Sequence, residues 1–298
     1  MKADDSSLAP EDLRVVEESA RQLLNRAAAW NRLPTPIDDI LAAANLKVAP
    51  TSAFNPQAIV SYLKNRGHDA SRLLKSAVSK ILGVYDSAEN VIHIDDSVVA
   101  SKQRFLKLHE AGHHELPTHR KVFRFFQDCE KTLDPEIADQ FEREANNFAR
   151  FAIFQGDLFA RMAADCKFEI RTPIQLGPKF GASIYASVRE FARSNRRACL
   201  VYVLEPIKLR NGSEPCAVVR RIEPSPSFRR QFGCPTDLVI TMTHPLGRVL
   251  PVGRKMTKPV SVPLTDLNGT SHECVAEAFD TTYNVLILLY PHQGAGQK

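Results

Sequence analysis

Residues 105–114 read FLKLHEAGHH, and this stretch carries the strongest chemical signal in the chain. His109 and His113 are four residues apart, and residues at this spacing lie on one face of a helix. Both imidazoles can therefore reach one metal ion, and neutral imidazole is a good ligand for zinc. Glu110 follows the first histidine directly, so its carboxylate can accept a proton from a water molecule beside the metal without being a ligand. The stretch predicts a helix that carries a metal site and a general base.

The two residues between this glutamate and the second histidine are small, Ala111 and Gly112. A glycine inside a helix costs about 1 kcal/mol relative to alanine. Its presence is easier to understand if another part of the molecule must approach the helix backbone at Gly112. We therefore expect a close neighbour on this side of the helix.

A catalytic zinc site needs a third protein ligand, and a second helix offers one. Helical spacing of apolar residues predicts a helix over 135–154, which contains the run FEREANNFA at 141–149. Glu142 and Asn146 are four residues apart and share a face. The rival ligand Glu144 points about 200° away from Glu142 around the helix. We expect Glu142 to be the third ligand; in the alternative interpretation both glutamates are solvated helix charges.

Taken together, the two motifs resemble those of the ImmA/IrrE family of metallopeptidases. The matching residues are RF at 104–105, HEAGH at 109–113 and the E-x-E-A-N-x-F-A pattern at 142–149. The resemblance covers roughly residues 30–160, and it includes a strand expected over 91–94 before the first helix. It implies a zincin-like helical core with a small sheet.

The resemblance also implies a role for each matching residue. The ligands of one zinc ion per chain are implied to be His109, His113 and Glu142. Glu110 is implied to be catalytic. Asn146 is implied to support the ligands by contacting them without binding the zinc itself. The implied activity is a zinc-dependent endopeptidase that cleaves a specific partner, such as a helix-turn-helix transcriptional repressor. Manganese could replace zinc at this ligand set, although the set favours zinc.

The sequence departs from the family pattern at three places. His114 stands where an aliphatic residue is usual, and Lys107 stands where a small polar residue is common. The run FAIFQ at 151–155 replaces the usual Leu-Met-Pro. These differences leave metal binding intact, but they leave the substrate and the subfamily open.

Two further histidines lie near the motif. His114 is one residue past a ligand and so about 100° off the metal face, which argues against a fourth ligand. His119 lies beyond Pro117, where we expect a surface loop. In the alternative, His119 reaches back and stabilises an oxyanion.

The chain as a whole predicts an α+β protein in three parts. We expect a zinc peptidase-like domain over 1–160, a helix-turn-helix-like unit over 161–197 and a strand-rich domain of unknown role over 198–298. The expected helices span 13–30, 36–44, 70–82, 97–115, 135–154 and two short stretches within 173–195. Ser97 or Ser101 is the expected cap of the metal-site helix. The expected strands span 46–48, 84–86, 90–94, 199–204, 217–222, 238–242 and 285–290.

The stretch 176–193 has the outline of a helix-turn-helix, with one helix ending at Gly181 and Ser183 capping the next. In a DNA-binding unit the second helix enters the major groove. The residues that could then contact phosphates or a partner are Arg189, Arg193, Arg196 and Arg197. In the alternative, which we favour, the two helices only complete the preceding core.

Charge is distributed unevenly along the chain. The net charge is +5, but residues 171–260 hold 16 Lys/Arg and 5 Asp/Glu, which gives +11 and leaves −6 for the rest. Such a basic region could contact DNA or an acidic partner, or it could be a solvated surface. The alternative function is therefore a DNA-associated regulatory protein in which the zinc site is structural or vestigial.

The remaining composition argues against several classes of protein. No stretch approaches the roughly 18–20 apolar residues of a membrane helix. The first ten residues are polar and acidic, unlike a secretory signal, so we expect a cytoplasmic protein. The six cysteines form no Cys-x-x-Cys pair, which argues against a disulfide framework or a cysteine zinc knuckle.

Overall fold

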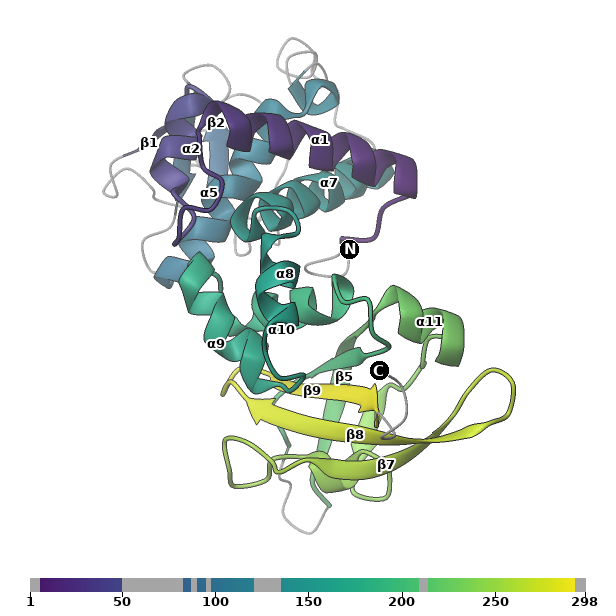
Figure 1. The fold of residues 1–298 in the computed structure, drawn as a ribbon. Helices are drawn as coiled ribbons and strands as arrows, with labels where there is room; N and C mark the ends of the chain where they lie inside the picture. The colour runs from purple at the N-terminus through teal and green to yellow at the C-terminus, as the bar shows by residue number, and fades with distance from the viewer. Residues whose placement is uncertain are drawn as a thin grey trace. The chain divides into compact units, whose positions relative to one another are not determined.

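The computed structural model describes residues 6–49, 83–86, 90–94, 98–120, 135–208 and 214–292, which combine helices and strands (Figure 1). The chain divides into two compact units. The N-terminal unit comprises Met1–Leu158 with Phe180–Ala182, and the C-terminal unit comprises Phe159–Lys179 with Ser183–Lys298. The first expected boundary, at residue 160, lies close to this division. The helix expected over 70–82 lies outside the described residues.

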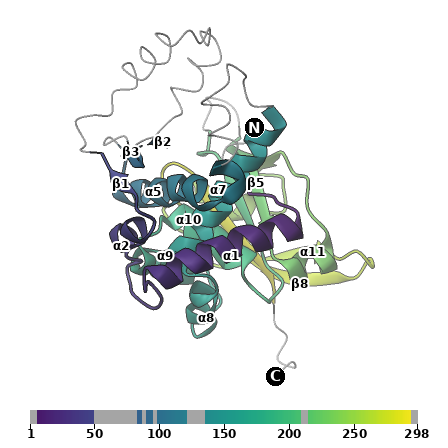
Figure 2. The same ribbon diagram turned by 90° about the horizontal axis from the view of Figure 1, so that it is seen from above.

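The N-terminal unit consists of helices packed beside a small sheet. Its helices are α1 (Pro10–Arg26), α2 (Ile37–Ala43), α5 (Ala100–Glu115) and α7 (Pro135–Phe154). Its strands are β1 (Lys47–Val48), β2 (Gly83–Asp86) and β3 (Val91–Ile94), in the order β1-β3-β2. β1 runs parallel to β3, and β2 runs antiparallel to it. Figure 2 shows the three strands gathered beside α5.

Helices α5 and α7 pack closely against each other at Gly112. A Cβ atom built on Gly112 would lie 3.1 Å from Cβ of Phe148 and 3.3 Å from Cα of Ala145. Real Cβ contacts are seldom this short, so a side chain at residue 112 would push Phe148 back by a few tenths of an ångström, and its absence favours the close approach of the two helices. The neighbour expected at this glycine from the sequence is therefore α7. Leu108 of α5 and Phe148 of α7 are completely buried beside the contact.

The residues at which α5 and α7 begin and end can be explained in part by the local sequence. α7 has the expected bounds, and the chain leaves it through Gly156, whose φ of +63° suits a residue without a Cβ. α5 ends at Glu115, and Leu116 is extended, as expected for a residue before proline. The start of α5 differs from expectation, because its cap is Val99, which makes no side-chain cap bond, and Ser101 lies inside the helix. Ser97 lies outside the described residues.

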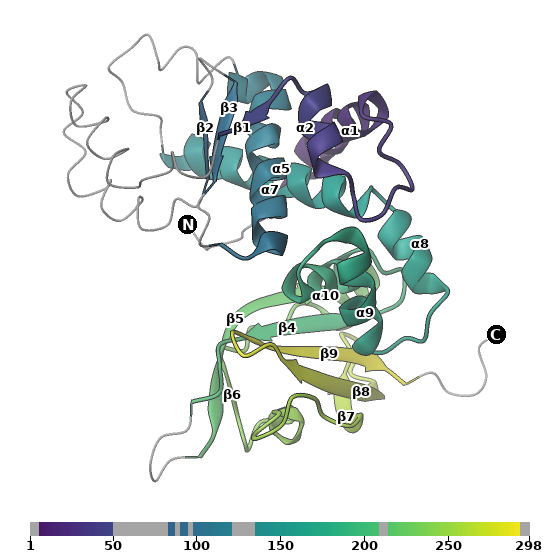
Figure 3. The same cartoon turned by 90° about the vertical axis from the view of Figure 1, so that its left-hand side faces the viewer.

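The C-terminal unit is built on a six-stranded antiparallel sheet (Figure 3). Its strand order is β6-β5-β4-β9-β8-β7. The strands are β4 (Leu200–Leu204), β5 (Cys216–Pro224), β6 (Val239–Thr241), β7 (Val260–Thr265), β8 (Ser271–Asp280) and β9 (Val285–Pro291). The helices are α8 (Leu158–Ala164), α9 (Arg171–Phe180), α10 (Ile184–Arg193) and α11 (Pro226–Phe232), with a 3-10 turn at Gly247–Val249. The two central strands, β4 and β9, are buried along nearly their whole length.

The two helices expected to form a separate unit over 161–197 pack with the strands instead. α9 is followed by Gly181, with φ of +73°, and the Ser183 side chain caps α10 by accepting a hydrogen bond of 3.2 Å from the amide of Ala186. These local features match the expected helix-turn-helix outline. α10, however, lies against β4 and β5, and Val188 and Phe191 are buried there (Figure 3). The helices thus belong to the compact unit that contains the sheet.

The contact at Gly112 generates a prediction about stability. Replacing Gly112 with leucine should lower the free energy of unfolding of the N-terminal unit by about 1–3 kcal/mol, because the new side chain overpacks the α5–α7 contact although leucine favours helices. Denaturant unfolding followed by circular dichroism measures the change.

The matched control places the same side chain at an exposed position of α5, as Lys102→Leu. Surface changes of this kind usually alter stability by less than about 0.5 kcal/mol. Equal stabilities for Gly112→Leu and Lys102→Leu would contradict the packing argument.

Candidate metal centre

Three potential metal ligands converge between α5 and α7. Nε2 of His109 and Nε2 of His113 are 3.2 Å apart. The Glu142 carboxylate lies 3.3 Å from the first nitrogen through Oε2 and 3.5 Å from the second through Oε1. Both histidines are buried, whereas 41% of the Glu142 side chain remains exposed, so the group is open to solvent on the glutamate side. These three residues could hold a metal ion.

The spacing of the two histidine donors fits a small tetrahedral ion. Zinc binds nitrogen and oxygen ligands at about 2.0–2.2 Å, and a tetrahedron of that size has edges of roughly 3.3 Å between ligand atoms. The 3.2 Å between the two Nε2 atoms is close to such an edge. The two carboxylate oxygens of Glu142 each lie near one of these nitrogens, Oε2 at 3.3 Å from His109 and Oε1 at 3.5 Å from His113. Three ligands of this kind also leave a fourth position for water or substrate.

The outer nitrogens of the two histidines are both engaged. Nδ1 of His109 lies 3.1 Å from Oδ1 of Asn146, and Nδ1 of His113 lies 3.0 Å from Nδ1 of His119. An amide oxygen only accepts, so His109 carries its proton on Nδ1. If His113 does the same, both Nε2 lone pairs face each other and a carboxylate. This arrangement of acceptors suits a bound cation.

Two of the three ligands, His113 and Glu142, are held in the deprotonated form that metal binding needs. Burial, with the charges of His109 and His119, lowers the pKa of His113 to about 4, so this imidazole is neutral at pH 7. Burial alone would raise the pKa of Glu142, but hydrogen bonds and charges from His109 and His113 hold it well below its ordinary value. For His109, burial is likewise outweighed, here by Glu142 and Glu110, and its pKa is raised. Metal ligands bind in their deprotonated forms, so binding would release any proton held there.

Glu110 lies beside the ligands but is not one of the three converging groups. It is buried on α5, directly after His109, and its negative charge contributes to the raised pKa of that histidine. The Glu110 carboxylate therefore lies close to the metal site without being one of its ligands. This is the placement that the sequence predicts for a general base.

The expectation that His119 lies in a surface loop is wrong. His119 is completely buried, and its ring stacks on Phe141 with 3.9 Å between ring centroids. Its Nδ1 contacts His113, and its Nε2 lies 2.8 Å from Oε2 of Glu144. Because both ring nitrogens are occupied, the alternative role as an oxyanion donor is also unsupported. His114 is half-buried and is not among the converging ligands.

Glu144 likewise differs from a solvated helix charge. Only 12% of its side chain is exposed, and besides His119 it accepts a hydrogen bond of 2.8 Å from Nε2 of Gln140. As expected from its position around α7, it does not join the metal group. Motif spacing alone did not indicate the contact between Glu144 and His119.

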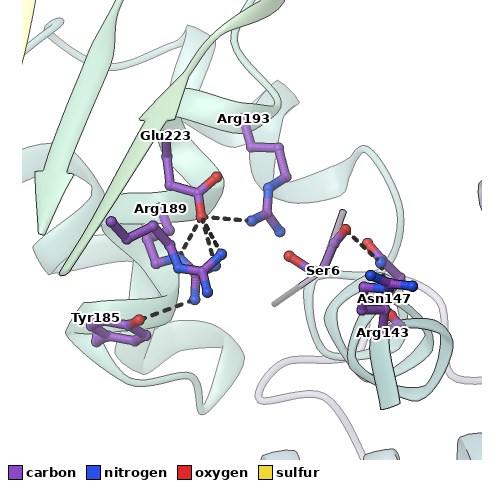
Figure 4. A network of polar contacts seen from close by, with 8 residues as sticks. Ser6, Arg143, Asn147, Tyr185, Arg189, Arg193 and Glu223 are labelled. Atoms are coloured by element: carbon purple, nitrogen blue, oxygen red, sulfur yellow. Dashed lines mark hydrogen bonds and ion pairs between the residues drawn. The ribbon is translucent and has the colours of Figure 1, made fainter. Parts of the chain in front are cut away.

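The arginines expected to contact DNA or a partner have different environments. In Figure 4, Arg189 and Arg193 point toward Oε1 of Glu223, with Arg189 donating from Nε at 3.0 Å and Nη2 at 2.6 Å, and Arg193 donating from Nη2 at 3.0 Å. Arg189 is also buried, so it cannot reach a phosphate without giving up this pair. Arg197 lies over the ring of Phe168, 4.2 Å from its centroid. Arg196 and Arg197 are exposed, and the expectation of DNA contact remains a prediction for these two.

The fold of this chain is similar to that of known protein structures. A Mycobacterium tuberculosis transcriptional regulator of known structure is similar to this chain, with 13% identity and a TM-score of 0.51. The match covers 92% of this chain and 74% of the regulator. At this identity the likeness concerns the fold alone. No protein family model matches the sequence, and no curated protein matches it.

None of the helices in the described ranges is long and apolar enough to cross a membrane.

The converging ligands predict metal binding that depends on Glu142. Purified wild type, supplied with zinc, should contain about one zinc ion per chain by elemental analysis, and Glu142→Ala should lose it, because two histidines alone make an incomplete site. Glu136→Ala, an exposed glutamate on the first turn of α7, is the control and should keep the metal. A zinc-free wild type would contradict the assignment of the site.

The Glu223 cluster predicts a pH-dependent contribution to stability. Burial alone would raise the pKa of Glu223, but the charges of Arg193 and Arg189 hold it below its ordinary value. A depressed folded-state pKa means that the contribution is complete above about pH 4.3, the ordinary glutamate value, and is lost as the pH falls through the folded-state pKa. Glu223→Gln should therefore destabilise the C-terminal unit at pH 7 by roughly 3 kcal/mol.

Denaturant unfolding at pH 7 and pH 3 measures this difference, which should shrink at the lower pH. Glu205→Gln is the control, because Glu205 pairs with Lys208 at the surface and such pairs contribute less than about 1 kcal/mol. A Glu223→Gln effect no larger than that of Glu205→Gln would contradict the buried-cluster interpretation.

Proposed function

We propose that this chain is a zinc-dependent endopeptidase of the ImmA/IrrE type, with a zincin-like N-terminal core. The observation that supports this most is the convergence of His109, His113 and Glu142 within metal-binding distance of one another, with Glu110 beside them. The HEAGH motif alone occurs in many sequences, and its combination with Glu142 as a third potential ligand is what favours a catalytic zinc site.

Glu110 and Asn146, which lie beside the candidate ligands, suggest how the reaction would proceed. When bound, zinc would polarise the carbonyl group of the scissile bond and lower the pKa of a water molecule beside it. Glu110 would take a proton from the water as its oxygen attacks the carbonyl carbon. Glu110 would then deliver this proton to the amine nitrogen as the C–N bond breaks. Asn146 would keep His109 oriented throughout, through the contact at Nδ1.

A specific protein partner is the substrate class that fits the resemblance. Because the ImmA/IrrE family is described as cleaving transcriptional repressors, we propose a repressor with an exposed loop as the substrate of this chain. The exposed basic side chains of the C-terminal unit, including Arg196, could bring the enzyme to an acidic partner or to DNA that carries it.

The test of this proposal is the Glu110→Gln variant. It should keep a full zinc complement, because Glu110 is not a ligand, and lose at least about 100-fold in cleavage rate, the usual contribution of a general base. A proteome-derived peptide library, with products identified by mass spectrometry, serves as an unbiased substrate. Glu136→Gln is the control and should cleave at the wild-type rate.

Two outcomes would count against the proposal. Wild-type protein that is fully loaded with zinc and cleaves nothing in the library or in a helix-turn-helix repressor would argue against a peptidase. Equal cleavage by wild type and Glu110→Gln would remove Glu110 from the mechanism.

A second candidate is a DNA-associated regulator with a structural or vestigial zinc site. It is favoured by the likeness to the mycobacterial transcriptional regulator and by the basic region over 171–260. It predicts DNA binding by the full chain that weakens steeply with salt and is unchanged by Glu110→Gln. Absence of a DNA shift at low salt would remove this candidate.

A further inference from the structure

Behind the candidate ligand His113 lies a line of buried polar groups that the proposed reaction does not use. Nδ1 of His113 contacts Nδ1 of His119 at 3.0 Å, and Nε2 of His119 contacts Oε2 of Glu144 at 2.8 Å. The other oxygen of Glu144 accepts from Gln140. This line therefore connects a metal-site histidine of α5 to the side of α7 that faces away from the metal group.

The surroundings fix the orientation of His119. The residue lies just beyond α5, in a helical turn over 117–120, and none of its surface is exposed. Phe141 of α7 covers the ring face, with the two ring planes tilted by only 20°. A completely buried imidazole with a hydrogen-bond partner at each nitrogen has little freedom to rotate, so His119 can hold its neighbours in place.

The hydrogen bonds of this line have one consistent direction when both imidazoles are neutral. The carboxylate of Glu144 only accepts, so Nε2 of His119 is the donor to it. Nδ1 of His119 is then unprotonated and must accept, which makes Nδ1 of His113 the donor. The proton of His113 is thereby placed on Nδ1, and the lone pair of its Nε2 is left facing His109 and Glu142.

We propose that His119 and Glu144 form a positioning pair, which holds His113 in the Nδ1–H tautomer and so prepares its Nε2 to bind the metal. The inference deepens the proposed function, since it takes the converging group to be a metal site. It assigns roles to two residues outside the HEAGH motif. Neither residue touches the metal position, and both act through His113.

The two histidine ligands are therefore supported in different ways from the same helix. At Nδ1, His109 is held by the side chain of Asn146, whereas His113 is held by the ring of His119, which in turn contacts Glu144. Groups that orient metal-binding histidines typically change metal affinity by about 10–100-fold when they are removed. We expect an effect of this size for His119.

The experiment uses three variants of the full chain and measures zinc affinity by chelator competition. His119→Phe keeps the stacked ring against Phe141 and removes both hydrogen bonds, and it should weaken zinc binding by about 10–100-fold. His119→Asn restores an acceptor near the former Nδ1 and should bind zinc more tightly than His119→Phe. Glu144→Ala leaves the His113–His119 contact in place and should give a smaller loss in the same direction.

A matched control is His114→Phe, because His114 lies next to His113 in sequence but outside the converging group. It should bind zinc as wild type does. A general loss of stability from histidine replacement near the site would weaken zinc binding in this control as well, and that outcome would overturn the proposal.

A second measurement needs no metal. Long-range ¹H–¹⁵N correlation spectra of histidine-labelled, zinc-free protein report which ring nitrogen carries the proton. Wild type should show His113 as the Nδ1–H tautomer, and His119→Phe should shift it toward a mixture of tautomers. A merely structural role for His119 would change the stability of the protein without changing the tautomer of His113.

The two measurements separate this inference from the proposed function. Wild type that cleaves nothing but shows the expected tautomer and a zinc affinity dependent on His119 would leave the positioning pair standing and remove the peptidase. His113 in the Nε2–H tautomer in the metal-free wild type, or equal zinc affinity in wild type and His119→Phe, would overturn the positioning pair even if cleavage is observed.

Discussion

The close approach of α5 and α7 at Gly112 is the constraint on which the candidate site depends. The two histidines lie on one helix and Glu142 on the other, so the distance between helix axes sets the distance between donors. The nearest donor atoms are separated by 3.2–3.5 Å, and a side chain at position 112 would press on Phe148 and so push the two helices apart. The helix propensity lost at a mid-helix glycine is thus offset by a contact that brings ligands from two helices to one point.

Helix α7 contributes more than a ligand, because it presents different faces to different parts of the site. Glu142 faces the histidine Nε2 atoms, Asn146 one turn later holds His109, and Glu144 on another side holds His119. The carboxylates two residues apart therefore have separate tasks, one at the metal position and one behind it. Burial and hydrogen bonding, and not residue type, distinguish the two glutamates.

The spacing of residues in the sequence predicts features that lie within one helix or between two helices. It does not predict features that depend on packing between segments far apart in the sequence. The bounds of α7 and the shared face of Glu142 and Asn146 follow from helical periodicity. The burial of His119 does not, because Pro117 interrupts the helix and only the tertiary position of Phe141 covers the ring. The same holds for the C-terminal unit, where Glu223 meets Arg189 across 34 positions of sequence. Strands β7 and β8 were not predicted, although burial alternates along β7: Pro263 lies within β7, and Glu273 and Glu277 interrupt the apolar residues of β8.

The strand order of the C-terminal sheet has a consequence for how the chain folds during synthesis. β4 is buried along its length and pairs on one side with β5, which follows it closely, and on the other with β9, where Leu204 meets Val285. The ribosome makes the N-terminal unit first, and its helices can pack while later residues are still being added. An emerging β4 has no partner on its β9 side until translation has passed Val285. The C-terminal unit therefore exposes an apolar strand edge for longer, and that edge is where chaperone binding or aggregation of the nascent chain would be concentrated.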